Sequence, residues 1–303
     1  MSHEIDRILA AAADRTWLID EAKAAEIVNL LALRAQTGGP GAWDGEENAP
    51  TYAAEPIEGR RGTVHVLRLD GVIMPRGGMM ARMSGGASLE QFGRAFETAA
   101  ADGDAQAIVI GVDSPGGVID LVEETAAKVF AARRSGRPII AVADTLAASA
   151  AYWIASAADE LVVTPSGSVG SIGVYGMHDD LSKALEMRGI ARTLIRSGPR
   201  KAEGAVGPLD DAALRHRQAS ADYAYEMFVA SVARHRGVPK SVVRADPESA
   251  ERHFGGGRAY HARDAVRLGM ADRIATMEET LRRVAHGRRP VGSRTARARL
   301  ALN

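Results

Sequence analysis

From residue 62 onward, short apolar runs alternate with stretches that have helical spacing. The apolar runs at Val64–Leu69, Ala107–Val112 and Pro138–Ala143 are long enough for buried strands. Between them, Leu89–Ala101 and Val118–Arg134 have the apolar spacing of helices. This alternation predicts an α/β domain built on parallel strands.

The alternation continues to about residue 274. The expected elements are a helix at Ser149–Ala157, a strand at Leu161–Thr164, a turn rich in glycine and serine up to Val174, a helix at Asp179–Met187, a strand at Thr193–Ile195, a long amphipathic helix at Asp210–His235 and a helix-turn-strand unit at Arg263–Ile274. The sequence therefore predicts one large α/β domain with extensions.

The extensions lie at the two ends. Residues 3–36 have apolar spacing typical of two or three short helices, and residues 37–61 are rich in glycine and proline and lack periodicity. We therefore expect a helical extension and linker at 1–61, the α/β domain at 62–276 and a basic tail at 277–303. The arginine-rich tail has little to bury, which predicts a solvated segment; the alternative is a docking arm for an acidic partner or nucleic acid.

Composition narrows the possible chemistry. The chain has 38 Lys and Arg against 38 Asp and Glu, so no bulk charge favours nucleic acid or a membrane surface. The absence of cysteine excludes disulfides and thiolate chemistry. There is no metalloprotease motif, calcium loop or phosphate loop, so we predict neither a metal nor a cofactor.

The pattern also bears on location. Charged residues interrupt the first 29 residues, so we expect no signal peptide. No apolar run approaches the ~20 residues of a membrane-spanning helix. We expect a cytoplasmic protein.

The first chemical motif is Asp-Ser-Pro-Gly-Gly at residues 113–117, directly after an apolar run. Gly116 and Gly117 let the backbone approach a substrate closely, with amides available to hold an oxyanion. Taken alone, the motif also fits an ordinary turn from strand to helix.

The second motif is Ala-Ala-Ser-Ala-Ala-Tyr at residues 147–152. Its small residues would let Ser149 lie at a helix start with an exposed hydroxyl, and the Ala150 amide would be a second oxyanion donor. Taken alone, Ser149 could equally be an N-cap.

The third motif comprises a glycine- and serine-rich stretch at 167–174 and a later segment, 197–203, that contains Lys201. A lysine amine acts as a base only when neutral, a form that burial and nearby positive charge favour. Arg196 and Arg200 could supply that charge. Taken alone, Lys201 would be an ordinary surface residue.

In this order, the motifs resemble those of the S49 peptidases, the signal peptide peptidase A family. The resemblance covers about Val64 to Ile274 and implies Ser149 as nucleophile, Lys201 as base and Ser171 as the group that orients the lysine amine. It also implies an oxyanion hole formed by the Gly116–Gly117 turn and Ala150; which glycine donates stays open.

The resemblance further implies the spiral ββα fold shared by Clp proteases and crotonases, assembly into a homo-oligomeric ring, and a protein or peptide substrate. Since no membrane anchor is expected, the chain looks most like the phage branch, the minor capsid or head-maturation proteases. Scaffold, capsid or portal proteins would be its partners, in the bacterial cytosol or the procapsid. Any scaffold would be a separate chain, because few residues follow Met277.

Four alternatives remain. A Clp-type triad could use His178 as the base, with Asp179 or Asp180 beside it. A crotonase-like acyl-CoA enzyme is disfavoured because no glutamate lies between Ala143 and Asp159. General cytosolic degradation of proteins or peptides, and a catalytically inactive structural capsid component, are the other two.

Overall fold

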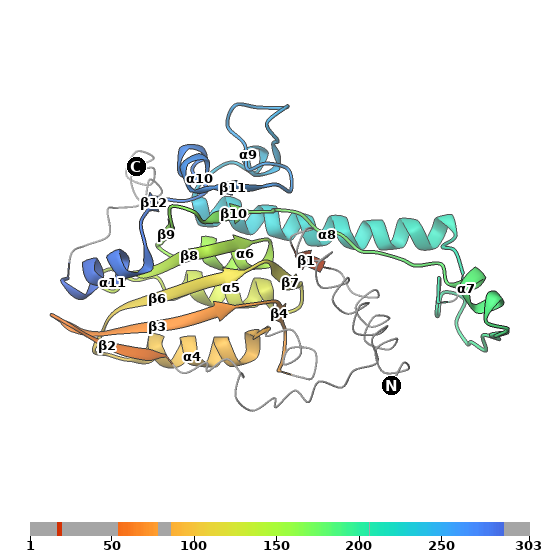
Figure 1. The fold of residues 1–303 in the computed structure, drawn as a ribbon, viewed down its shortest axis with the longest axis horizontal. Coiled ribbons are helices and arrows are strands. Elements are labelled where there is room, and N and C mark those ends of the chain that lie inside the picture. Colours follow the sequence, from red (N-terminus) through yellow and green to blue (C-terminus); the bar gives the residue numbers. More distant parts are fainter. Residues whose placement is uncertain (1–16, 20–53, 78–85, 206, 288–303) are drawn as a thin grey trace.

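An eight-stranded sheet lies at the centre of the computed structural model, which describes residues 17–19, 54–77, 86–205 and 207–287 (Figure 1). The strands run in the order β11-β10-β8-β6-β3-β2, with β9 beside β8 and β12 beside β9. They are β2 (Glu55–Gly59), β3 (Gly62–Asp70), β6 (Ala105–Ser114), β8 (Ile139–Ala148), β9 (Glu160–Val163), β10 (Ser168–Gly170), β11 (Ala259–His261) and β12 (Arg273–Ile274).

The central strands β3, β6 and β8 are parallel, as the alternation predicts. Their crossovers are α4 (Leu89–Ala101) and α5 (Val122–Ala131). Side chains alternate along β6: Ile108 and Ile110 join the large core beneath the helices, while Ala107 and Val109 face a smaller core on the other side. The α/β class predicted from the sequence is therefore confirmed.

A second, four-stranded sheet has the order β1-β7-β4-β5. Its strands are β1 (Trp17–Ile19), β4 (Ile73–Met74), β5 (Ala87–Ser88) and β7 (Gly116–Val118). Because β4 follows β3 and β7 follows β6 within a few residues, this small sheet is built at the carboxyl ends of the central parallel strands. Ligand sites of open α/β sheets are formed at these ends.

Strand β7 corrects one sequence expectation. The helix predicted from Val118 begins instead at Val122, because Gly116–Val118 is a strand and Leu121 has a positive φ of 68°. By contrast, α4 has the predicted bounds.

The long helix α8 (Asp211–Arg236) packs on the domain only through its carboxyl-terminal half. Phe228 is buried there and stacks on Trp153, with 4.5 Å between ring centroids. The amino-terminal half extends away from the sheets, together with α7 (Ser182–Met187) and the segment that joins the two helices (Figure 1). The predicted strand at residues 193–195 is absent and Ile195 is 94% exposed, because no strand of the described residues lies beside this segment to pair with it.

Three more helices, and the buried helix α6 described below, complete the domain. They are α9 (Lys240–Arg244), α10 (Ala262–Leu268) and α11 (Met277–Ala285). No helix within the described ranges is long and apolar enough to cross a membrane.

Helix α11 does not fit the expectation of a solvated tail from residue 277. Thr276 and Glu279 form a capping box at its start, and Val284 is buried against the sheet. Arg283 Nη2 donates to Glu160 Oε2 at 2.5 Å, so an arginine of the expected tail pairs with a buried carboxylate. The domain therefore extends through α11.

At the other end, Trp17–Ile19 is a strand where the spacing predicts helix, because its backbone pairs with β7. The predicted linker of residues 37–61 is wrong at its end, because Glu55–Gly59 is strand β2 and pairs with β3. The remaining predicted helices of residues 3–36, the linker before residue 54 and the tail after residue 287 lie outside the described residues.

Candidate active site

Ser149 lies between the end of β8 and the start of α6 (Ala150–Ser156). Its φ of 53° and ψ of −118° are unusual for a residue with a side chain, and such a conformation costs about 1–3 kcal/mol. The Ser149 amide donates to the Gly170 carbonyl at 2.7 Å, and its carbonyl accepts from the Trp153 amide at 2.9 Å. These backbone bonds hold the residue in its strained conformation.

The Ser149 side chain is 1% exposed, so the expectation of an exposed hydroxyl is wrong. It makes no capping hydrogen bond, which argues against the N-cap alternative. Its Oγ has no hydrogen-bond partner among the residues that the structure describes. A strained backbone and an unpartnered buried hydroxyl together are typical of a functional residue rather than a structural one.

Helix α6 explains how this serine is held. All seven of its residues are buried, and four of them are alanine or serine, so the helix fits closely among the surrounding elements. The Ala150 amide belongs to the first turn, where helix N–H groups have no partner within the helix. The Ala150 amide thus lies at the start of α6, directly after Ser149.

The glycine turn is fixed by Ser114, which is fully buried. The Ser114 hydroxyl donates to the Gly71 carbonyl at 2.6 Å and accepts from the Gly116 amide at 3.2 Å. Gly116 has a φ of 102°, which strongly favours glycine. A Cβ on Gly117 would overlap the Ile73 carbonyl oxygen, so a side chain cannot fit there either. Both glycines are thus required by the backbone, and the Gly116 amide is already engaged.

Ser171 lies next to the residue that holds Ser149. It is 7% exposed, has a φ of 54°, and its amide donates to the Arg258 carbonyl at 2.9 Å. Strands β8 and β10 pair in parallel with Ala148 opposite Gly170. The structure thus brings Ser149, Ala150 and Ser171 together at the ends of these two strands, and the glycine turn adjoins them because Ser114 pairs with Ala147.

Lys201 is not part of this cluster within one chain. It is exposed and lies between α7 and α8, where Arg196 Nη1 donates to its carbonyl at 3.4 Å. Neighbouring Arg200 lies 3.8 Å from Asp210, the N-cap of α8. Asp210 precedes Phe228, which contacts Trp153 of α6, by 18 residues of helix or about 27 Å. Ser149 and Lys201 of the same chain are therefore beyond hydrogen-bond reach.

Of the two positive charges expected to act on Lys201, those of Arg196 and Arg200, one is offset by a carboxylate. Arg200 Nη1 donates to Glu203 Oε1 at 2.9 Å, so a carboxylate offsets its charge. His178, the alternative base, donates from Nε2 to the Gly207 carbonyl at 3.0 Å. Its ring is thus held within the segment that also contains Lys201, not beside Ser149.

Sequence reasoning missed a group of carboxylates at the ends of the central strands. Asp113 accepts from the Thr145 hydroxyl, and Arg68 lies 3.0 Å from Asp70 and 3.6 Å from Asp144. Burial raises the pKa of Asp70, although Arg68 opposes this shift. The positions at which β3, β6 and β8 end could have indicated this acidic rim beside the glycine turn.

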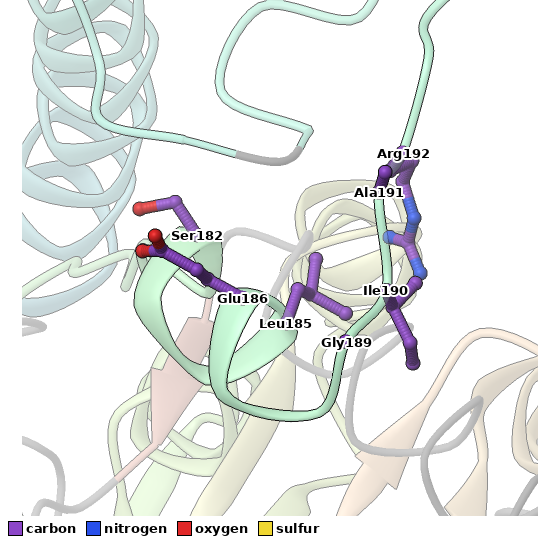
Figure 2. A pocket seen from close by; sticks show the side chains of 7 residues that line it. All are labelled: Ser182, Leu185, Glu186, Gly189, Ile190, Ala191 and Arg192. Atoms are coloured by element: carbon purple, nitrogen blue, oxygen red, sulfur yellow. The ribbon is translucent and has the colours of Figure 1, made fainter.

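An open depression of about 370 Å³ lies in the projecting segment rather than at Ser149. Figure 2 shows the side chains that line it, which are Ser182, Leu185, Glu186, Gly189, Ile190, Ala191 and Arg192. Several apolar side chains of this segment are exposed, including Met187 at 84% and Leu194 at 45%. Such a surface is typical of a contact with another protein chain.

The geometry of Ser149 and the glycine turn can be compared with known proteins. The sequence profile of peptidase family S49 matches residues 131–289, which include Ser149, Ser171 and Lys201. The chain belongs to peptidase family S49. This is the family that the motifs resemble in sequence.

One relative of this chain is capsid assembly protease C of Escherichia phage lambda, which is 28% identical over 86% of this chain and 55% of that protein. Another is Protease 4 of Salmonella typhi, 27% identical over 74% of this chain and 34% of that protein. The chain thus spans about a third to just over half of these relatives' lengths. The predicted resemblance to phage maturation proteases is confirmed.

Among solved structures, a membrane-bound stomatin-specific protease matches with a TM-score of 0.41 and 18% identity, over 73% of this chain and 84% of that chain. Matches of both predicted fold types, a ClpP protease and enoyl-CoA hydratases, are also found. The fold itself is defined by the strand order given above.

Proposed function

We propose that the protein is a serine endopeptidase in which Ser149 attacks the peptide carbonyl. The observation that supports this most directly is the Ser149 hydroxyl, which is buried, unpartnered among the described residues and held on a strained backbone at the start of α6. The membership in a peptidase family agrees with this role.

The oxyanion would be held by two amides, those of Ala150 and Gly117. Ala150 supplies a free helix-end amide next to the nucleophile. Of the two glycines, Gly117 is the better donor because the Gly116 amide already donates to Ser114 Oγ at 3.2 Å.

Lys201 would act on Ser149 of a neighbouring copy of the chain. Within one chain, about 27 Å of helix lies between the Lys201 segment and the part of α8 that packs near Ser149. The same segment exposes apolar side chains that need a partner surface. Delivery of the base by a neighbour agrees with a Ser149 hydroxyl that has no partner among the described residues of the single chain.

The catalytic cycle is acyl transfer. The neutral Lys201 amine takes the Ser149 proton as the oxygen attacks the carbonyl, and the lysine then gives that proton to the leaving amine. Water, deprotonated by the same amine, releases the acyl group from Ser149. Ser171, next to the nucleophile, would hydrogen-bond and orient the incoming amine.

The substrate we propose is a scaffold or capsid protein of a phage or prophage. The relative named as a capsid assembly protease, which aligns with 86% of this chain, supports this proposal. General degradation of proteins or peptides is the second candidate, because Protease 4 of Salmonella typhi also aligns with most of the chain.

Cleavage of an unstructured protein such as casein tests the proposed chemistry. Wild type and His178→Ala should cut, while Ser149→Ala and Lys201→Ala should each lose activity by at least a thousandfold. If His178→Ala is inactive and Lys201→Ala cuts, the base is wrong. If no form cuts casein or a capsid-derived substrate, the chain is a structural component.

A further inference from the structure

The strand that leaves the glycine turn is paired with a distant segment of the same chain. Strand β1 (Trp17–Ile19) runs antiparallel to β7, with Ile19 opposite Gly116, Leu18 opposite Gly117 and Trp17 opposite Val118. In Figure 1, β1 is drawn beside β7 and β4, apart from the main sheet. Its other edge has no strand among the described residues.

The edge of β7 that β1 covers is where an extended substrate would bind. A peptide that adds to a sheet edge uses its backbone for affinity and its alternate side chains for specificity. A peptide antiparallel to β7 would run from Val118 toward Gly116, so its chain would approach the glycine turn and Ser149 carboxyl end first. Trp17–Ile19 has this direction and this register.

Ile19 also fills a specific apolar site. It is 4% exposed and clusters with Val72, Met74 and Val118, with Tyr175 packed against them. Val72 directly precedes β4 and Met74 belongs to it, Val118 belongs to β7, and Tyr175 follows the glycine- and serine-rich motif. The residue opposite Ile19, Gly116, has no side chain, so the space is left for an aliphatic group.

We infer that Trp17–Ile19 is a tethered substrate mimic, which occupies the peptide-binding edge of β7 and must leave before an extended substrate can bind. This inference rests on the proposed function. It predicts that the enzyme favours an aliphatic side chain at the position of Ile19, and that the free chain is held in a competitively inhibited state.

Peptide binding to full-length Ser149→Ala protein tests this inference without requiring turnover. The probe is a fluorescein-labelled peptide with the sequence of residues 15–22. Adding Ile19→Asp places a charge in the apolar site and should release β1, so the probe should bind at least tenfold more tightly than to Ser149→Ala alone. A probe with aspartate in place of its isoleucine should lose this gain.

Two further variants keep the experiment decisive. Ile57→Asp changes an exposed residue of the edge strand β2 to the same acid and should leave probe affinity within twofold of the parent. Ile19→Ala, the milder change at the site, should give a smaller gain of the same sign if Ile19→Asp fails to fold.

Equal probe affinity in the parent and both Ile19 variants would overturn the inference, as would a probe that binds none of them. A gain in probe affinity, together with no cleavage of casein by protein that retains Ser149, would uphold the inference while rejecting the proposed peptidase chemistry. With active protein, Ile19→Asp should lower the KM for an extended peptide about tenfold and leave kcat within twofold, since only a competitor is removed.

Discussion

The amide of Ser149 donates a 2.7 Å hydrogen bond to the carbonyl of Gly170. This bond joins the end of β8 to the glycine- and serine-rich motif and fixes Ser149 in its positive-φ conformation. It also places Ser171 one residue from the group that holds the nucleophile. The two motifs that are separate in the sequence therefore form one site.

The Ser114 hydroxyl should act as a positioning group for the oxyanion turn. Ser114→Ala removes its bonds to the Gly71 carbonyl and the Gly116 amide, so the turn should loosen. We expect kcat to fall roughly tenfold or more while KM changes less than twofold, because a hydrogen bond of this kind is worth about 1–3 kcal/mol when its partner is left unsatisfied. Steady-state peptide cleavage measures both constants.

The control for this change is Thr98→Ala, which removes an exposed hydroxyl that donates to the Arg94 carbonyl. It should leave both constants unchanged. A KM increase without loss of kcat in Ser114→Ala would assign the hydroxyl to substrate binding instead.

Arg236 should anchor the carboxyl-terminal end of α8 to the domain. Its guanidinium donates to both carboxylate oxygens of Asp272, at 2.9 and 2.8 Å, and the two side chains are only 3% and 6% exposed. Arg236→Met leaves the Asp272 charge buried without its partner, which should lower the free energy of unfolding by about 3–5 kcal/mol. Urea unfolding followed by circular dichroism measures this change.

Arg234 is the matched control. It is half exposed and lies 3.7 Å from Glu123, so Arg234→Met should cost less than about 1 kcal/mol. Equal losses for the two variants would show that the buried pair has no special role.

His235 should make the protein sensitive to acid. It is fully buried, and burial, together with Arg234, Arg133 and Arg236, lowers its pKa from the ordinary 6.5 to about 3. Below pH 6.5, His235 takes up a proton in the unfolded chain but stays neutral in the folded chain. The neutral His235 therefore supports the fold above pH 6.5, and stability falls as the pH drops from there toward 3, by about 1.4 kcal/mol per pH unit.

His235→Gln removes this titration. Ser156 Oγ donates to the Trp153 carbonyl, so His235 Nδ1 donates to Ser156 at 3.0 Å, a bond that a glutamine amide can replace. Unfolding free energies measured between pH 7 and 4.5 should depend less on pH in the variant. Parallel curves for the two proteins would contradict the prediction.

Much of the fold was predictable because strands that are buried on both faces form continuous apolar runs in the sequence. Strands β3, β6 and β8 and helix α4 follow from local apolar runs and their spacing. The strand Gly116–Val118 was not predictable, because it forms only by pairing with β1 and β4. Similarly, α11 is helical because Arg283 and Val284 find partners on distant strands.

The residues of the candidate site were proposed from the sequence for a different reason. Ser149, Gly116, Gly117 and Ala150 lie beside strand ends, where small residues in sequence already indicate a close backbone approach. The distance between Ser149 and Lys201 could not be read from the sequence, since it depends on how far α8 extends beyond the domain. Composition and spacing alone also cannot show that the chain's own segment pairs with β7.

Mixing two inactive variants tests the central claim most directly. Ser149→Ala and Lys201→Ala proteins are unfolded, combined in equal amounts and refolded together. The mixture should regain about a quarter of wild-type peptidase activity, because one site in four combines an intact Ser149 from one copy with an intact Lys201 from its neighbour. Wild type refolded with the double variant should also lose about half of its activity per wild-type chain. No recovery in the first mixture, with undiminished activity in the second, would show that Ser149 and Lys201 of the same chain act together and would contradict the account.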